Sequence, residues 1–439
     1  MSSRKGGGLS DAERDALLTH VVARGGVKRP AAAEQPKERR AGEFSALPGY
    51  RELIMQRSLG SALGFDDPFY RLHEGRAGPE TRIGGRTFLN FSSYDYLGLN
   101  GHPNVTAAAK AAVDMYGTSP SASRLTAGER PIHRELEKGL AEIYGAEACL
   151  CMVSGHATNV TTIGHLVGAK DLVVYDSMAH NSILVGAKLS GAERRSFAHN
   201  DISTLDALLS AMRDRYENVL IAVEGLYSMD GDYPDLPALI EVKRRYGAWL
   251  MVDEAHALGV LGRRGHGLFE HFGVDPRQVD IWMGTLSKTL SACGGYIAGS
   301  AQLIDYLKFI AGGYVYSVGM SPVLAAAAVA SLDLMRREPE RVAKLQANGA
   351  YFVERAKKAR LNTGMSGGYS VVPIIVGDSL RTVSLGQKIY NRGIYALPII
   401  PPGVPDKSAR LRFFITAEHS KEQIEQAVAV TAEESARLS

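Results

Sequence analysis

Cysteine and tryptophan are scarce in this chain of 439 residues, which contains 3 cysteines and 2 tryptophans. So few cysteines exclude the disulfide framework of a small secreted domain. We interpret Cys149, Cys151 and Cys293 as buried, small hydrophobic residues in a reducing compartment. Cys149 and Cys151 are expected to point to opposite faces of one strand.

Long apolar runs are also missing. The longest, residues 323–332, is too short to span a bilayer as a helix, so we expect no membrane span. The first residues run into Gly6, Gly7 and Gly8 rather than into an apolar stretch, and we therefore expect no signal peptide. Together with the cysteine usage, this pattern predicts a cytoplasmic protein.

The charge excess is small, with a net charge of +3, 45% hydrophobic and 22% charged residues. This is an ordinary globular composition, and it does not favour nucleic acid as a partner. No zinc-ligand spacing is present. The length is sufficient for a large domain and a smaller one.

Residues 1–45 differ from the rest, because they are rich in Gly, Ala, Pro, Lys, Arg and Glu. We predict a flexible basic N-terminal arm with a short helix at 11–23. The arm is either a disordered tail or a docking element for a partner protein. Both alternatives stay open at this level.

From residue 47 onwards the pattern is globular. We expect an N-terminal segment at 46–101, a large domain at 102–336 and a small C-terminal α+β domain at 337–439. In the large domain, short apolar runs alternate with helical stretches, which indicates an α/β fold with a mostly parallel sheet covered on both faces. The predicted strands of this domain are 148–153, 172–176, 219–225, 249–253, 281–285 and 296–298.

Lys288 and Asp253 are the most informative pair in the sequence, because each follows an apolar strand pattern. A lysine can bond the aldehyde of pyridoxal phosphate (PLP), and a carboxylate can keep the ring nitrogen of this cofactor protonated. A lone lysine is most often a solvated surface group, and a lone aspartate is most often a strand-end cap. The ordered pair favours a PLP site instead.

Further motifs also follow strand ends, where open α/β sheets bind ligands. Gly155 and His156 lie in a small-residue turn that opens a helix, which predicts a cradle for the cofactor phosphate. His180 is expected to stack on the cofactor ring, with a hydrogen-bonded structural histidine as the alternative. His256 is expected to reach the phenolate oxygen. The acidic loop 224–232 fits no metal-binding pattern, so we expect a polar loop and no metal.

These segments occur in an order that resembles a known family. The segments are 90–99, 224–232, 253–256, 285–288 and 409–412. The chain is similar to the α-oxoamine synthases, the group of 8-amino-7-oxononanoate synthase, 2-amino-3-ketobutyrate CoA ligase, 5-aminolevulinate synthase and serine palmitoyltransferase. The resemblance implies the fold-type I architecture of PLP-dependent transferases and a homodimer with the active site at the subunit interface.

The same resemblance implies roles for individual residues. Catalytic roles fall to Lys288, Asp253, His180 and His256, and further cofactor contacts fall to Gly155, His156, Ser228 and Thr285. Arg412 matches the arginine that binds the substrate carboxylate, which suits the geometry of a guanidinium. Tyr94 lies near that carboxylate, at a position where the family usually has asparagine. Val318 and Gly403 also depart from the family pattern, whereas Ser317 keeps a hydroxyl in the cross-subunit segment.

We therefore expect a PLP-dependent acyltransferase that condenses an amino acid with an acyl thioester and releases carbon dioxide, giving an α-amino ketone. The thioester is carried either on coenzyme A or on an acyl carrier protein. An aminotransferase or a carbon–carbon lyase of the same fold is one alternative. A non-catalytic partner subunit is the other.

Overall fold

The computed structural model describes residues 42–62 and 66–438. The chain divides into a unit up to Leu63 and a unit from Gly64 onwards. The first unit contains a 3₁₀ turn, η1 (Phe44–Ala46), and the helix α2 (Pro48–Ala62). Residues 1–41 of the predicted basic arm, with the predicted helix at 11–23, lie outside the described residues.

Within the described residues of the second unit, seven strands form the central sheet, in the order β3-β9-β8-β7-β6-β4-β5. They are β3 (Ala148–Met152), β4 (Leu172–Asp176), β5 (Glu193–Phe197), β6 (Val219–Glu224), β7 (Trp249–Asp253), β8 (Ile281–Thr285) and β9 (Gly295–Gly299). The sheet is mostly parallel, as predicted. β9 departs from the expected parallel run, since it is antiparallel to both β3 and β8.

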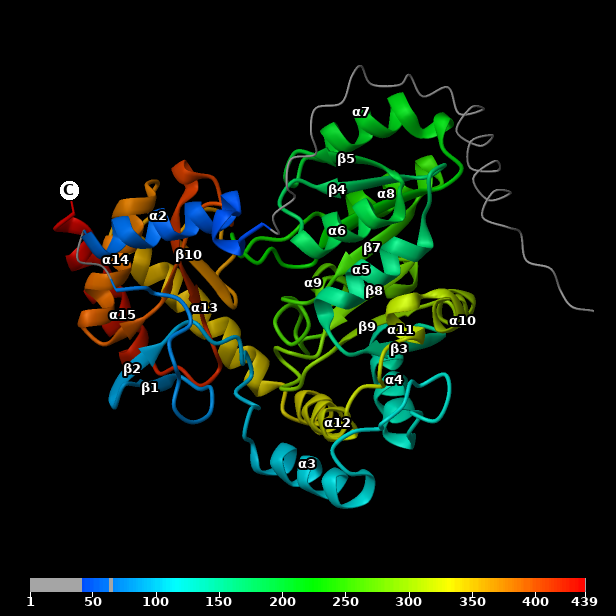
Figure 1. The fold of residues 1–439 in the computed structure, drawn as a ribbon, viewed down its shortest axis with the longest axis horizontal. Coiled ribbons are helices and arrows are strands. Elements are labelled where there is room, and N and C mark those ends of the chain that lie inside the picture. The colour runs from blue at the N-terminus through cyan, green and yellow to red at the C-terminus, as the bar shows by residue number, and fades with distance from the viewer. Residues whose placement is uncertain (1–41, 63–65, 439) are drawn as a thin grey trace, which may run out of the picture. The chain divides into compact units, whose positions relative to one another are not determined.

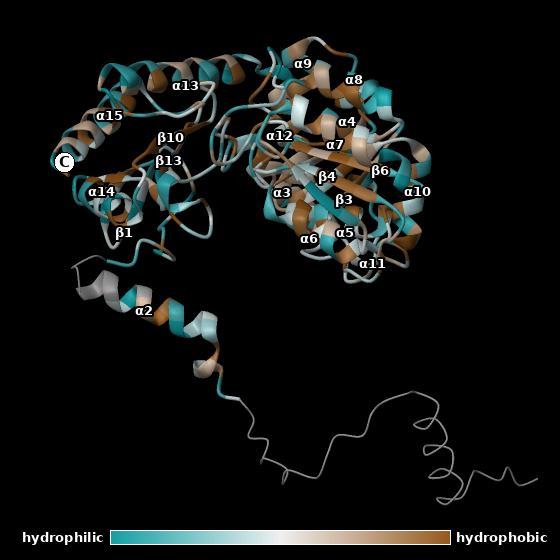
Figure 2. Ribbon diagram, turned by 90° about the horizontal axis from the view of Figure 1, so that it is seen from above, coloured by the Kyte–Doolittle hydropathy of each residue, from teal (hydrophilic) through white to brown (hydrophobic). Residues whose placement is uncertain are grey.

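Helices cover both faces of this sheet (Figure 1). One face packs on α5 (Gly155–Leu166), α6 (Asn181–Ser190), α10 (Ala301–Ile310) and α11 (Gly312–Val315). The other packs on α4 (Pro131–Tyr144), α7 (Ile202–Met212), α8 (Leu236–Tyr246), α9 (Leu268–Phe272) and α12 (Pro322–Arg337). Apolar residues gather along the strands between these layers (Figure 2). Burial on both faces is the reason that the central strands read as continuous apolar runs.

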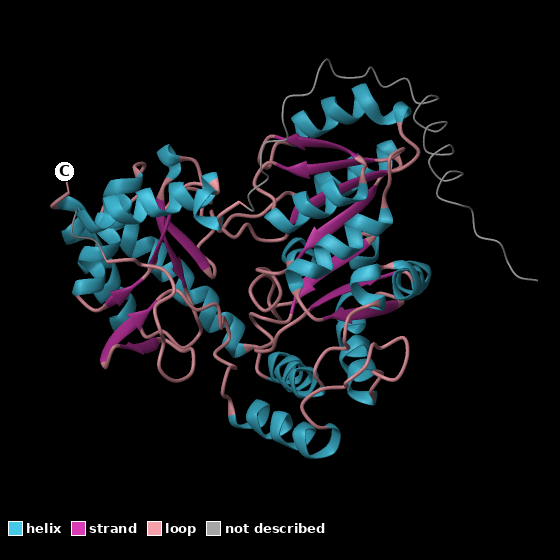
Figure 3. Cartoon of the chain, viewed as in Figure 1, coloured by secondary structure: helices cyan, strands magenta, loops and turns pink. Residues whose placement is uncertain are grey.

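The C-terminal part contains small sheets and helices of its own (Figure 3). Its elements are α13 (Glu340–Lys358), β10 (Val371–Ile375), α14 (Ser379–Asn391), β11 (Ile394–Tyr395), β12 (Leu397–Ile399), β13 (Arg410–Phe414) and α15 (Lys421–Ala436). The N-terminal strands β1 (Glu80–Ile83) and β2 (Arg86–Asn90) belong to the same region, because β2 pairs in parallel with β11. The chain thus enters this region, leaves it through α3 (Pro103–Tyr116), and returns after α12.

The cysteine predictions are only partly correct. Cys149 and Cys151 are buried, but Cys293 is exposed. Cys149 and Cys151 also pack in the same core cluster, so the expectation of opposite faces is wrong. Residues two apart in a strand share a face, and here Leu150 and Met152 point to the other side.

Sequence patterns located most of the central strands and missed β5. Its sequence, Glu-Arg-Arg-Ser-Phe, carries no apolar run because β5 is an edge strand with mainly exposed side chains. Among the helices of the described part, none combines the length and the apolar character that a membrane crossing requires.

Candidate active site

The strand ends of the central sheet bring most of the predicted site residues into one cavity of about 90 Å³. β7 ends at Asp253, and the turn after β8 carries Lys288. Residues from the predicted site that line this cavity are Gly155, His156, His180, Asp253, His256, Thr285 and Lys288. Parallel strands align their carboxyl ends at one edge of the sheet, which is why residues far apart in sequence meet here.

Lys288 is the amine of this cavity. Burial lowers the pKa of Lys288 to about 8, while the charges of Asp253 and Glu224 act in the opposite direction. Its Nζ lies 5.8 Å from the ring centre of Tyr94. A lysine with a pKa this close to neutrality can lose and regain its proton at ordinary pH.

Asp253 is buried, and both oxygens of its carboxylate accept hydrogen bonds from protein groups. Its Oδ2 accepts a hydrogen bond of 2.8 Å from Nδ2 of Asn159, and its Oδ1 accepts one of 2.9 Å from the backbone N–H of Ala255. Asn159 also donates to Oγ of Ser182 at 2.9 Å, and Ser182 in turn contacts Nδ1 of His180 at 2.7 Å. A continuous chain of hydrogen bonds therefore links His180 to Asp253.

His180 and His156 stand at the open side of the cavity, where both are exposed. His180 precedes α6 and its Nδ1 accepts from the backbone N–H of Ser182 at 3.3 Å. Burial of its ring atoms lowers the pKa of His180, and the charge of Asp253 partly opposes this effect. The ring centres of the two histidines are 6.2 Å apart and nearly perpendicular.

His256 is buried and neutral, because burial and the charge of Lys288 hold its pKa well below the ordinary value. Nδ1 of His256 lies 2.6 Å from the hydroxyl of Tyr96. Burial raises the pKa of Tyr96, so the phenol keeps its proton and is able to donate it to Nδ1. In the tautomer that accepts this bond at Nδ1, the imidazole proton is on Nε2 and available to a hydrogen-bond acceptor.

At Gly155, in the turn from β3 into α5, the packing leaves no room for a side chain. A Cβ on Gly155 would lie 2.8 Å from Oγ1 of Thr285, and a Cβ on Gly295 would lie 2.7 Å from Cα of Gly155. Thr285 itself donates to the carbonyl of Gly294 at 2.9 Å. α5 begins at Gly155, and Oγ of its N-cap residue Ser154 accepts from the backbone N–H of Ala157 at 3.4 Å. The N-terminus of a helix at this edge of the sheet suits a phosphate group.

Arg412, on β13, and Ser228, in the loop after β6, contact each other but are not among the residues that line the cavity. The charge of Arg412 nevertheless acts on Lys288. Nη1 of Arg412 donates to the carbonyl of Ser228 at 3.1 Å, and its guanidinium lies 4.6 Å from the ring centre of Phe414. Burial lowers the pKa of Arg412, but a guanidinium stays charged. Within the described residues, no salt bridge joins Arg412 to a carboxylate, so its charge is available to an anionic ligand.

Sequence reasoning missed Asn159, Glu224, Tyr96 and Phe414 as members of the site. Asn159 and Tyr96 lie inside the motifs that predicted the site, but only the fold shows that they contact Asp253 and His256. Glu224 is a charged residue that ends a fully buried strand, which was a usable signal. Phe414 has ring contacts with Tyr94, Tyr96 and His256, and nothing in its sequence context predicts them.

The residues present fit PLP. Buried oxygens without a partner in the described structure, Oδ1 of Asn159 and Oε1 of Glu224, lie on residues that line the cavity. The cavity also combines an amine, a carboxylate and a helix N-terminus, which are the groups that the aldehyde, the ring nitrogen and the phosphate of PLP require.

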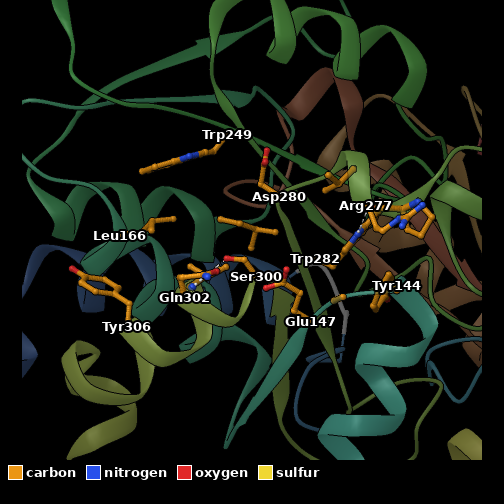
Figure 4. A pocket seen from close by; sticks show the side chains of 17 residues that line it. Tyr144, Glu147, Leu166, Trp249, Arg277, Asp280, Trp282, Ser300, Gln302 and Tyr306 are labelled. Carbon is orange, nitrogen blue, oxygen red and sulfur yellow. Dashed lines mark hydrogen bonds between the residues drawn. The ribbon is translucent and has the colours of Figure 1, made fainter.

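A larger cavity of about 510 Å³ lies at the opposite edge of the sheet (Figure 4). Its charged groups already have partners inside the protein. Asp280 accepts from Lys243 at 2.5 Å, and Glu147 accepts from the N–H of Ala301 at 2.9 Å. Nothing there demands a ligand, and we place the active site at the carboxyl edge.

Comparison with known proteins gives a consistent result. The family model for aminotransferase class I and II matches residues 86–430. The chain is 40% identical to an 8-amino-7-oxononanoate synthase of Pseudomonas putida over 81% of its own length and 90% of that protein. It is 40% identical to the 4-hydroxy-2,2'-bipyrrole-5-methanol synthase PigH of Serratia over 79% of its own length, and the match spans 52% of PigH.

A solved structure is also similar. The serine palmitoyltransferase from S. paucimobilis with a bound PLP–myriocin aldimine superposes with a TM-score of 0.86 and 26% identity, covering 90% of this chain and 99% of that one.

Proposed function

We infer that this chain, which belongs to the class I and II aminotransferase family and to its α-oxoamine synthase group, joins an amino acid to an acyl thioester with loss of carbon dioxide. It is a PLP-dependent acyl-transferring enzyme. The product proposed is an α-amino ketone. The observation that carries the proposal is the shared cavity of Lys288, Asp253 and His256. The charge of Arg412, which forms no salt bridge within the described residues, acts on Lys288 of this cavity.

PLP, when bound, supplies an aldehyde for an amine to bond and a ring that accepts electron density. Around it, Lys288 would hold the cofactor and then take the α-proton of the amino acid, since a pKa of about 8 lets the amine lose and regain a proton near neutral pH. Asp253 keeps a negative charge for the ring nitrogen. His180 would lie against the ring, and His256 would donate from Nε2 to the phenolate oxygen.

Arg412 is proposed to bind the carboxylate of the amino acid. Its position between the carbonyl of Ser228 and the face of Phe414 fixes the guanidinium plane. Tyr94 is proposed to limit the room for the amino-acid side chain, because its ring centre lies 5.7 Å from that of Phe414 and 5.8 Å from Nζ of Lys288. This arrangement supports a small amino acid as the first substrate.

A homodimer is proposed on the basis of an exposed apolar surface. Leu125, Tyr316 and Val318 have exposed fractions of 48%, 90% and 51%, and they line one surface depression together with Ser317. Exposed apolar groups that gather in this way are typical of an interface. A second copy of the chain is the occupant that the family relationship favours.

The function is tested by product analysis. The purified protein with PLP is offered a panel of amino acids with acyl-coenzyme A and acyl carrier protein thioesters. We expect release of free thiol, carbon dioxide and an α-amino ketone in equal amounts. A keto acid without thiol release would indicate an aminotransferase, and an unchanged cofactor spectrum with every amino acid would indicate a non-catalytic subunit.

A further inference from the structure

Glu224 is a buried carboxyl group beside the carboxylate of the active site. It ends β6, where its backbone is in register with that of Asp253 on β7. Its exposed fraction is 3%, and its side chain lines the cofactor cavity. Two carboxyl groups this close in a dry environment resist ionising together, so one of them tends to keep a proton.

The hydrogen bonds around the pair are unequal. Asp253 accepts from Asn159 at 2.8 Å and from Ala255 at 2.9 Å. Glu224 accepts at Oε2 from the N–H of Ser228 at 3.3 Å, longer than either bond to Asp253, and the N–H of His180 also acts on this carboxyl group. Oε1 of Glu224 is buried and has no partner within hydrogen-bond distance in the described structure. Hydrogen bonds to the ionised form favour that form, so the negative charge belongs on Asp253 and the proton on Glu224.

The other groups that face Glu224 do not change which of the two carboxyl groups keeps the proton. Burial raises the pKa of Glu224 well above its ordinary value, and the charge of Asp253 raises it further. Lys288 and the backbone N–H groups of Ser228 and His180 act in the opposite direction. Lys288 is itself close to losing its charge, because its own pKa is lowered to about 8.

We propose that Glu224 is protonated at neutral pH and donates a hydrogen bond from its unpartnered oxygen to an acceptor oxygen of the bound cofactor. A protonated carboxyl is a donor, whereas an ionised one is an acceptor only. This inference rests on the proposed function only in taking the cavity as the cofactor site. Protonation of Glu224 would also leave Asp253 as the negative charge of this carboxyl pair beside the ring.

The protonation state is measured by infrared difference spectroscopy on the cofactor-free protein at pH 7. The wild type should show the carbonyl stretch of a protonated carboxyl that is absent from Glu224→Gln. Glu254→Gln is the matched control, because burial raises the pKa of Glu254 to about 8. The spectrum of this variant should lack a different carbonyl band, that of protonated Glu254. A carboxylate band for Glu224 at pH 7 would overturn the proposal.

The donor role is measured by PLP affinity. Glu224→Gln keeps an N–H donor at the same place and should bind PLP within about threefold of the wild type, whereas Glu224→Met should bind about tenfold more weakly. Equal affinity for both variants overturns the donor role.

If Glu224→Gln does not fold, Asp253→Asn replaces it in the infrared measurement, because removal of the neighbouring charge should lower the pH at which the Glu224 acid band disappears. An unshifted band overturns the proposal.

Neither measurement needs an amino acid or a thioester. Failure of the condensation assay therefore leaves this inference standing, and failure of this inference leaves the condensation standing.

Discussion

Nη1 of Arg410 donates a hydrogen bond of 2.6 Å to Oδ1 of Asp230, and both side chains are buried. Arg410 lies on β13, two positions before Arg412, and Asp230 lies in the loop after β6. Arg410 also donates to the carbonyl of Met229 at 3.0 Å. The pair therefore holds the loop that contacts Arg412, and so positions the proposed carboxylate site.

Asp230→Ala should strongly destabilise the protein, because it leaves the guanidinium of Arg410 buried without its carboxylate. We expect a loss of about 3–5 kcal/mol in the free energy of unfolding, measured in urea. Glu354→Ala is the control, since its ion pair with Lys358 is exposed to solvent and its loss should change the free energy of unfolding little. Equal losses for the two variants would contradict the role of the buried pair.

Capture of PLP by the cofactor-free protein should accelerate as the pH rises through about 8, where Lys288 loses its proton. An ordinary lysine would need a pH near about 10.4. Lys288→Ala should give no borohydride-reducible adduct, whereas Lys188→Ala, an exposed lysine of α6, should behave as the wild type. An adduct mapped to another lysine sinks the assignment.

Asp253→Asn should fold and lose turnover, because the amide has the volume of the carboxylate but not its charge. The expected increase in the activation barrier is on the order of 3–5 kcal/mol, from kcat/KM. Asn159→Ala removes one hydrogen bond to Asp253 and should cost about 1 kcal/mol of barrier. Near-wild-type turnover for Asp253→Asn is the result that refutes its role.

Val318→Asp should prevent the proposed dimerisation, because it places a charge in the exposed apolar surface around Ser317. We expect a monomer in light scattering and a parallel loss of turnover. Leu380→Asp is the control, because Leu380 on α14 is similarly exposed, with a fraction of 53%. If the wild type were active as a monomer, the hypothesis that two subunits share each active site would be wrong.

Deletion of residues 1–44 tests the acyl donor. The basic arm carries Lys28, Arg29, Lys37, Arg39 and Arg40. Acyl carrier proteins are acidic, so long-range attraction should favour a carrier-bound donor over free acyl-coenzyme A. We expect the truncated protein to lose kcat/KM for the carrier-bound donor, most strongly at low salt. Unchanged use of both donors would leave the arm without a role in donor selection.

Much of the fold and of the cofactor chemistry follows from local sequence. Short apolar runs predicted the central strands because strands covered on both faces must be apolar throughout. Lys288 and Asp253 could be paired because each follows such a run, and aligned strand ends converge. Their assigned roles stay predictions that the variants above test.

Tertiary structure alone decided what surrounds that pair. β6 and β7 are adjacent in register, which puts Glu224 beside Asp253, and the order of strands in a sheet is not written in their order along the chain. The contact of Tyr96 with His256 joins residues 160 positions apart, and β2 pairs with β11 across a much longer sequence gap. Local sequence sets which residues end a strand; long-range packing sets which of those ends become neighbours and which carboxyl group keeps a proton.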